Sequence, residues 1–193
     1  LRSNLLDIMF GMSIVTLIWQ NTNWLAIQIG FCVVFAVWLI FLKPLTKHSA
    51  IVIQAGVTQF VALWALFTVG YSLPQVFVVL AAAAIGYVAA HHVINIFAQE
   101  FEDTLLNLSW AFVVAALAWI TWHWTIAYTP LRIPQISLVV TLLSFWTLTL
   151  YQTWYKESVG QRVDKRTMTA PTAFTLAGIA LLMISNFFDQ TSL

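Results

Sequence analysis

Seven long apolar stretches set the strongest limit on how this chain can fold. Each approaches the roughly 20 residues that an α-helix needs to cross a hydrocarbon core of about 30 Å. The predicted helices lie at residues 4–20, 23–42, 50–69, 73–97, 104–128, 134–155 and 170–188. The sequence therefore predicts an all-α fold, a polytopic transmembrane helical bundle of about seven helices that forms a single domain over residues 1–193.

The composition agrees with a membrane environment. Hydrophobic residues make up 61% of the 193 residues and charged residues 8%, whereas soluble domains are about 25% charged. A formal net charge of +1 predicts no nucleic-acid partner, because too few basic residues are present to neutralise a run of phosphates. The prolines fall at predicted breaks, where a missing N–H costs least, so we expect none inside a helix. They are Pro44, Pro74, Pro130, Pro134 and Pro171.

The basic residues predict an orientation. Cytoplasmic loops of membrane proteins carry an excess of lysine and arginine. With a cytoplasmic N-terminus, every basic residue except Arg132 falls on the inner side of the predicted bundle. The inner residues are Arg2, Lys43, Lys47, Lys156, Arg162, Lys165 and Arg166. We therefore expect an N-in, C-out multi-pass protein of a plasma or inner membrane.

One polar stretch, VAAHHVINIFAQEFEDT at residues 88–104, stands out at the end of the fourth predicted helix. At 1.5 Å per residue, its two histidines lie roughly 27 to 29 Å along that helix, near the cytoplasmic boundary. Asp7 and Asn107 should lie at a similar depth, because each follows the inner end of its own helix. The predicted ligand-binding or proton-binding residues are Asp7, His91, His92, Asn95 and Asn107.

The histidine pair leaves three interpretations open. Adjacent residues of a helix point about 100° apart, whereas helical metal sites offer ligands at positions i and i+4. A metal site would use His91, His92 and Glu102, but it would need Asp7 or Asn107 as well, and asparagine is a poor zinc ligand. The pair could instead bind a polar ligand or proton, or simply mark where the helix leaves the lipid. The pattern indicates no particular cofactor.

A further pattern concerns helix packing. Ala82, Gly86 and Ala90 repeat every four residues in the fourth predicted helix. Such a stripe of small residues lets the backbone of a neighbouring helix approach closely. We expect this face to pack against another helix.

Two functions remain open from the sequence. The first is a membrane binding protein, carrier or complex subunit that packs around a lipid or small apolar ligand, with the polar cluster at the cytoplasmic boundary. Its partners would be membrane lipids and other membrane subunits. The alternative is an intramembrane enzyme, metal-dependent in one version, that acts on a lipid-like substrate through His91, His92 and the nearby acids. We favour the first, because the chain has no catalytic motif such as HExxH.

Overall fold

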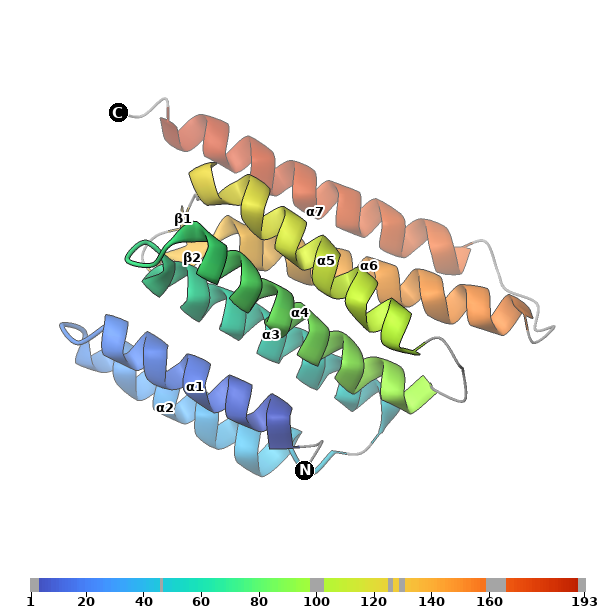
Figure 1. Cartoon of the computed structure of the whole chain (residues 1–193), viewed down its shortest axis with the longest axis horizontal. Helices are drawn as coiled ribbons and strands as arrows, with labels where there is room; N and C mark the ends of the chain where they lie inside the picture. Colours follow the sequence, from blue (N-terminus) through green and yellow to red (C-terminus); the bar gives the residue numbers. More distant parts are fainter. Residues whose placement is uncertain are drawn as a thin grey trace. The chain divides into compact units, whose positions relative to one another are not determined.

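The computed structural model describes residues 4–45, 47–97, 103–124, 127–128, 131–158 and 166–190. Within these residues the chain forms seven α-helices (Figure 1), which confirms the predicted all-α class. They are α1 (Asn4–Gln20), α2 (Leu25–Val37), α3 (His48–Gly70), α4 (Gln75–Phe97), α5 (Asp103–Thr121), α6 (Gln135–Ser158) and α7 (Arg166–Gln190).

Five of these helices are long and apolar enough to cross a membrane. Their candidate spans are Leu25–Leu42, Ala50–Gly70, Gln75–Ile94, Thr104–Thr121 and Gln135–Thr153. The apolar parts of α1 and α7 are shorter, at Leu5–Gln20 and Met168–Leu182. By length and composition, the helices are compatible with a membrane protein.

Two short elements alter the predicted helix boundaries. A π-helical segment, η1 (Trp38–Leu42), continues α2 to the predicted end of the second helix. The predicted fifth helix is wrong at its C-terminal end: α5 stops at Thr121 and is followed by a 3-10 turn, η2 (Trp122–Trp124). Strands β1 (Ala127–Tyr128) and β2 (Ile133–Pro134) then pair antiparallel. The proline at the end of β2 holds the residue before it in an extended conformation, which favours the hairpin over more helix.

The expectation that no proline lies inside a helix is also wrong. The seventh helix begins at Arg166 rather than at residue 170, which moves Pro171 from the predicted helix start into the second turn of α7. As the sixth residue of the helix, Pro171 removes one hydrogen bond to the preceding turn. The loss is tolerated because Pro171 lies near the start of the helix, where the first N–H groups have no intrahelical partner in any case.

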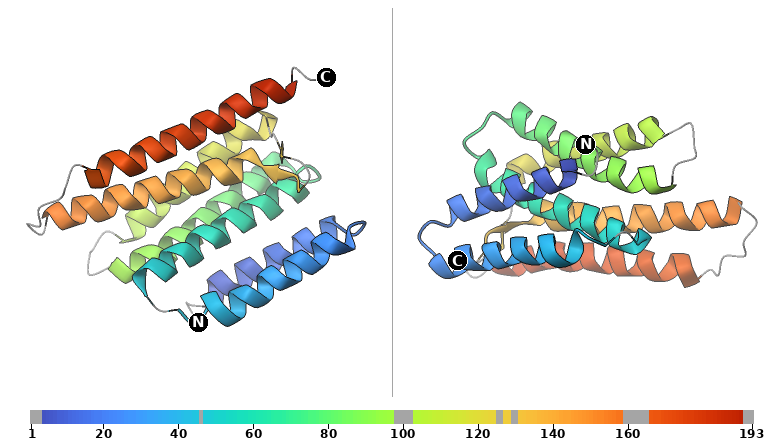
Figure 2. Two further views of the ribbon diagram at one scale, coloured as in Figure 1. Left: turned by 180° about the vertical axis from the view of Figure 1, so that it is seen from behind. Right: turned by 90° about the horizontal axis from the view of Figure 1, so that it is seen from below.

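The chain divides into two compact units, Leu1–Ser137 and Leu138–Leu193. In the first unit, α3 packs against both α1 and α4, and α4 packs against α5. Figure 2 shows α1 and α2 as an antiparallel pair from two directions. The inward face of α1 carries Leu6, Phe10, Ile14 and Leu17, each less than 4% exposed. These positions recur every three or four residues, as expected for one face of a helix.

The small-residue stripe of α4 packs as predicted. Ala82 is 0% exposed and Ala90 is 9% exposed. A Cβ atom added at Gly86 would lie 2.9 Å from Val114 Cγ2 and 3.4 Å from the Ala111 Cα atom of α5. The absence of a side chain at Gly86 therefore lets the two backbones come close.

The second unit pairs α7 with the greater part of α6. Trp146 Nε1 donates a hydrogen bond to Thr172 Oγ1 over 3.0 Å. The rings of Phe145 and Phe174 meet edge to face, with centroids 6.4 Å apart. Polar and aromatic contacts thus both join the two helices of this unit.

Candidate functional site

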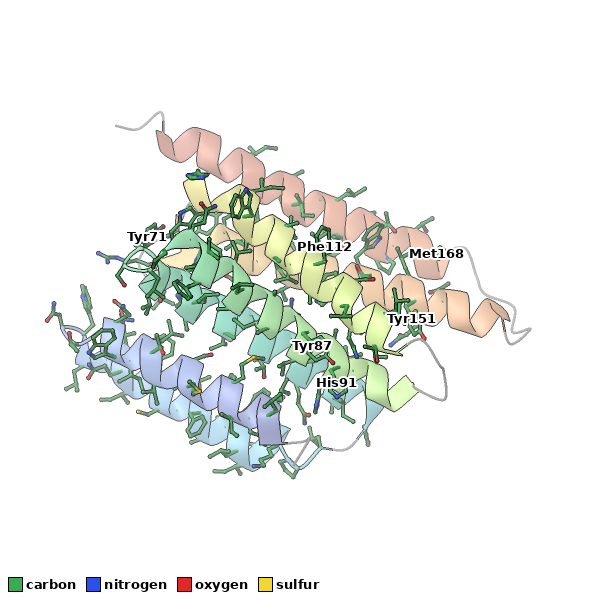
Figure 3. All side chains as sticks on the ribbon, viewed as in Figure 1. Tyr71, Tyr87, His91, Phe112, Tyr151 and Met168 are labelled. Atoms are coloured by element: carbon green, nitrogen blue, oxygen red, sulfur yellow. The ribbon has the colours of Figure 1, made fainter. Side chains whose placement is uncertain are left out.

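The up-and-down course of α1 to α5 gathers the polar candidates at one end of the first unit. The starts of α1 and α5 and the ends of η1 and α4 share this end, and Figure 3 marks it by His91. Asp7 lies on the first turn of α1, and Asn107 lies on the second turn of α5. The structure brings His91 into contact with Asn107, and Asp7 into contact with Trp38 and Lys43.

Asp7 is held by two side chains from the end of the second helix. Its Oδ1 atom accepts a hydrogen bond from Trp38 Nε1 over 3.1 Å. Its Oδ2 atom lies 3.1 Å from Lys43 Nζ in an ion pair. The Asp7 side chain is 19% exposed and that of Lys43 is 48% exposed. Its negative charge is therefore matched within the chain.

The π-helical segment explains why Trp38 and Lys43 meet the same carboxylate. In a regular α-helix, residues five apart point about 140° away from each other, because each residue adds about 100°. Here the Lys43 backbone N–H donates to the Trp38 carbonyl over 2.8 Å, the i to i+5 bond of a π turn. This wider turn brings Lys43 back over Trp38. Gln54 of α3 supports the segment by donating to the carbonyls of Leu42 and Leu45.

His91 faces α5. Its Nδ1 atom lies 3.2 Å from the side-chain nitrogen of Asn107, at hydrogen-bonding distance. The ring of Tyr87, one turn earlier on α4, stacks on the His91 ring with centroids 5.8 Å apart (Figure 3). Asn107 is only 1% exposed, and its Oδ1 atom has no hydrogen-bond partner among the described residues. This pair therefore joins α4 to α5 below the surface.

His92 points to a different neighbour, as expected for adjacent residues of a helix. The Asp7 carboxylate of α1 lies close enough to interact with it electrostatically. The His92 Nε2 atom is buried, and nothing in the described part of the chain forms a hydrogen bond with it. His92 Nε2, like Asn107 Oδ1, is thus a buried polar atom of the candidate residues without a described partner.

The remaining candidates bear on the metal interpretation. Among the described residues, no three His, Cys, Asp or Glu side chains come together in a way that could hold a metal ion. Glu102 lies outside the described residues, and so does the side chain of Asn95. The metal site with Glu102 stays a prediction.

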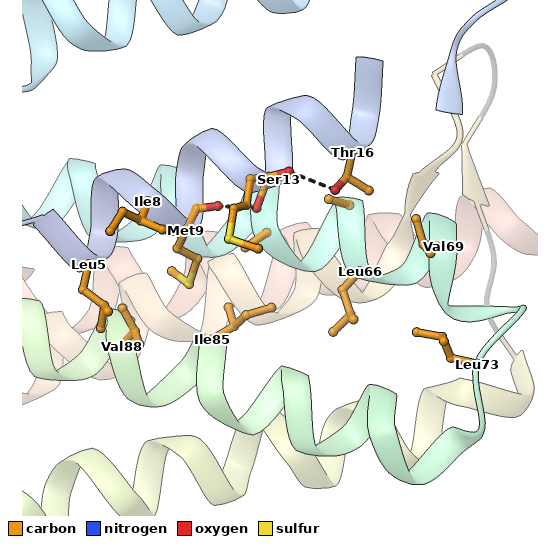
Figure 4. A pocket seen from close by; sticks show the side chains of 13 residues that line it. Leu5, Ile8, Met9, Ser13, Thr16, Leu66, Val69, Leu73, Ile85 and Val88 are labelled. Atoms are coloured by element: carbon orange, nitrogen blue, oxygen red, sulfur yellow. Dashed lines mark hydrogen bonds between the residues drawn. The ribbon is translucent and has the colours of Figure 1, made fainter. Parts of the chain in front are cut away.

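An apolar groove adjoins these residues. It has a volume of about 430 Å³ and is bounded by α1, α3 and α4. Figure 4 shows Leu5 and Val88 at one end of it and Val69 and Leu73 at the other. Its floor includes Ala62 and Ala65 of α3, and both are almost fully buried.

The groove offers its occupant little polar contact of its own. Ser13 and Thr16 are the polar residues along it, and each hydroxyl donates to a backbone carbonyl one turn back in α1. These bonds are 2.7 Å and 2.9 Å long, to Met9 and Met12 respectively. The groove therefore suits an apolar molecule.

Reasoning from the sequence missed Trp38, Lys43 and the groove. Asp7, alone in an apolar first turn, requires a nearby cation, and Lys43 is a basic residue predicted at the same boundary. That signal was present in the sequence. The contact of Trp38 depends on the π turn, for which the sequence carries no comparable signal. No protein-family model, curated protein or solved structure matches this chain.

Proposed function

We propose that this chain is an integral membrane protein that binds one acyl chain of a lipid in the groove between α1, α3 and α4. The observation that carries this proposal is the groove itself, an apolar hollow of about 430 Å³. That volume lies within the usual range of ligand pockets, about 300 to 1,000 Å³. Its rim includes Ile8 and Met12 of α1, which are 56% and 67% exposed.

The length of the groove supports an acyl chain as its occupant. Along α1 it runs from Leu5 to Thr16, a rise of about 16 Å at 1.5 Å per residue. One leaflet contributes about 15 Å of the 30 Å hydrocarbon core. A single lipid chain lying along the helices therefore matches the groove in length and in polarity.

The state of the polar residues favours binding over catalysis. A general base must reach its substrate with a free lone pair. The Asp7 carboxylate is engaged by Trp38 and Lys43, and His91 Nδ1 is engaged by Asn107. His92 Nε2 has no described partner, and a single imidazole nitrogen is sufficient for a hydrogen bond to a ligand. A carrier or complex subunit that holds lipid, with membrane lipids as partners, fits these residues better than an intramembrane enzyme does.

The proposed topology has seven spans, with the N-terminus in the cytoplasm of a cell bounded by a plasma or inner membrane. It rests on the asymmetry of lysine and arginine. Single cysteines at Ser72 and Lys47, two exposed positions at opposite ends of α3, test it in a Cys32→Ser background. In intact cells a membrane-impermeant maleimide should label Ser72→Cys and leave Lys47→Cys unlabelled. Equal labelling, or the reverse pattern, would contradict the orientation.

Lipid binding is tested by filling the groove. Val88 of α4 lines it, whereas Leu80 of the same helix is 61% exposed and lies outside it. Protein purified in mild detergent should retain about one lipid molecule by native mass spectrometry. Val88→Trp should lose that lipid, because the indole occupies the space of the chain. The matched control, Leu80→Trp, should keep it.

The contrary result is equally clear. If wild type, Val88→Trp and Leu80→Trp all retain the same amount of lipid, the groove is not the binding site. If the wild-type protein retains no lipid when it is taken directly from membranes, the proposed function is wrong.

A further inference from the structure

One helical turn beyond the inner end of the groove lies His92, whose buried Nε2 atom has no hydrogen-bond partner among the described residues. Val88 lines that end, and His92 follows it four residues later on nearly the same face of α4. Four residues of helix rise about 6 Å. Because Val88 lies on the face of α4 that borders the groove, His92 continues that face one turn farther along the helix. His92 therefore occupies the first position on this face of α4 beyond the inner end of the groove.

The His92 Nε2 atom is buried and has no hydrogen-bond partner among the residues that the structure describes. A buried polar atom without a partner is unfavourable, whether it serves as donor or as acceptor. A polar group at the end of a chain lying in the groove would satisfy it.

We propose that the groove selects a lipid with an uncharged hydroxyl headgroup, and that this hydroxyl forms a hydrogen bond with His92 Nε2. The inference rests on the proposed binding of an acyl chain and names the headgroup. A neutral imidazole nitrogen is a donor in one tautomer and an acceptor in the other, and a hydroxyl can serve either.

The charges around His92 explain why the headgroup is uncharged. Asp7 already has Lys43 on one oxygen and Trp38 on the other. An anionic headgroup would meet the Asp7 carboxylate, and a cationic headgroup would compete with Lys43 for it. A hydroxyl disturbs neither contact.

Three molecules with the same carbon chain length test the headgroup. They are oleyl alcohol, ionised oleic acid and octadecene, which carry a hydroxyl, a carboxylate and no headgroup. Each is added to the detergent-solubilised protein, and the bound amount is measured by mass spectrometry. The ratio of bound alcohol to bound octadecene should be about three- to tenfold higher for wild type than for His92→Phe, as the loss of one buried hydrogen bond predicts.

Two further variants make the result specific. His92→Gln keeps a hydrogen-bonding group and should retain much of the wild-type ratio. It also decides the matter if His92→Phe does not fold. His123, which is exposed at the opposite end of the first unit, supplies the matched control, because His123→Phe should leave the ratio unchanged.

The outcomes separate this inference from the proposed function. The same ratio in wild type, His92→Phe and His92→Gln would overturn the role of His92 while the groove still binds a chain. Preferential binding of oleate by wild type would overturn the uncharged headgroup. Failure of all three molecules to bind would overturn acyl-chain binding and, with it, this inference.

Discussion

The two sides of α4 differ sharply in how they meet their neighbours. On the side of α5, Ala82, Gly86 and Ala90 are buried, and the helices approach closely. On the side of α1, Ile85 and Val88 border an apolar groove of about 430 Å³. One helix therefore forms a tight interface on one side and an open one on the other.

Side-chain size explains the difference. Within a membrane, helices gain little by burying apolar surface, because lipid tails are equally apolar, so association depends on close packing. Small residues allow that packing along the α5 side. On the α1 side the larger side chains of Ile85 and Val88 line an open groove, which the proposed function assigns to a lipid chain. A membrane protein can thus build a binding site wherever its packing is incomplete.

The largest effect is expected when a large side chain is placed in the tight interface between α4 and α5. In Gly86→Leu even the first added carbon would lie 2.9 Å from Val114 Cγ2 and 3.4 Å from a backbone atom of α5. Because the backbone cannot move aside easily, α5 must shift. We expect the free energy of unfolding to fall by about 3 kcal/mol, the upper part of the usual range for overpacking. The melting temperature in detergent would measure it.

The matched control is Ala84→Leu, two residues earlier on the same helix. Ala84 is exposed, so the added side chain should meet lipid or detergent instead of protein. Its melting temperature should stay close to that of wild type. Equal losses in the two variants would mean that α4 and α5 do not depend on the close contact at Gly86.

The helices could be predicted from the sequence because hydropathy and helix breaks are local properties. Residues 4–20 were predicted as a helix, and α1 spans Asn4–Gln20. The small-residue stripe of α4 also predicts the close approach of a neighbouring helix, which is α5 at Gly86. The π-helical end of α2 was not predicted, because its hydrogen-bond register is supported by Gln54 on another helix. Such tertiary support leaves no periodic pattern in the sequence.

In the candidate site, too, some features follow from local sequence and others depend on tertiary contacts. The shared end of Asp7, His91, His92 and Asn107 follows from the alternating direction of consecutive helices. Which of these residues contact one another does not follow from the sequence, because the contacts depend on how each helix is rotated about its axis. Spacing alone did indicate that the two histidines face different neighbours, and His91 indeed faces Asn107 of α5.

The adjacent histidines lie on different sides of α4, and their substitutions should affect stability differently. His91 belongs to the packed side, and its loss would leave the amide of Asn107, 1% exposed, without its described side-chain partner. We expect His91→Leu to lower the free energy of unfolding by about 1 to 2 kcal/mol. His92→Leu removes a buried polar atom that has no described partner, so in lipid-free detergent it should not lower the free energy of unfolding. Melting temperatures of the two variants would decide this.

A double variant provides the control for that pair. In His91→Leu/Asn107→Leu both polar partners are replaced by apolar groups, which removes the stranded amide. Such paired replacements are often nearly neutral, so the double variant should be more stable than His91→Leu alone. Strictly additive losses would contradict the proposed contact between His91 and Asn107.

The smallest expected effect lies on α2, whose outer face contrasts with both sides of α4. A Cβ atom added at Gly30 would meet nothing within 4 Å, and its neighbours Ile29 and Val33 are each 55% exposed. With space available, Gly30→Ala should raise the free energy of unfolding by about 0.5 to 1 kcal/mol, since alanine loses less backbone entropy in a helix. The same change at Gly86 should lower it. If the melting temperature also falls for Gly30→Ala, a neighbouring helix must approach α2 closely at Gly30. That helix would belong to another membrane subunit, and lipid would not cover this face.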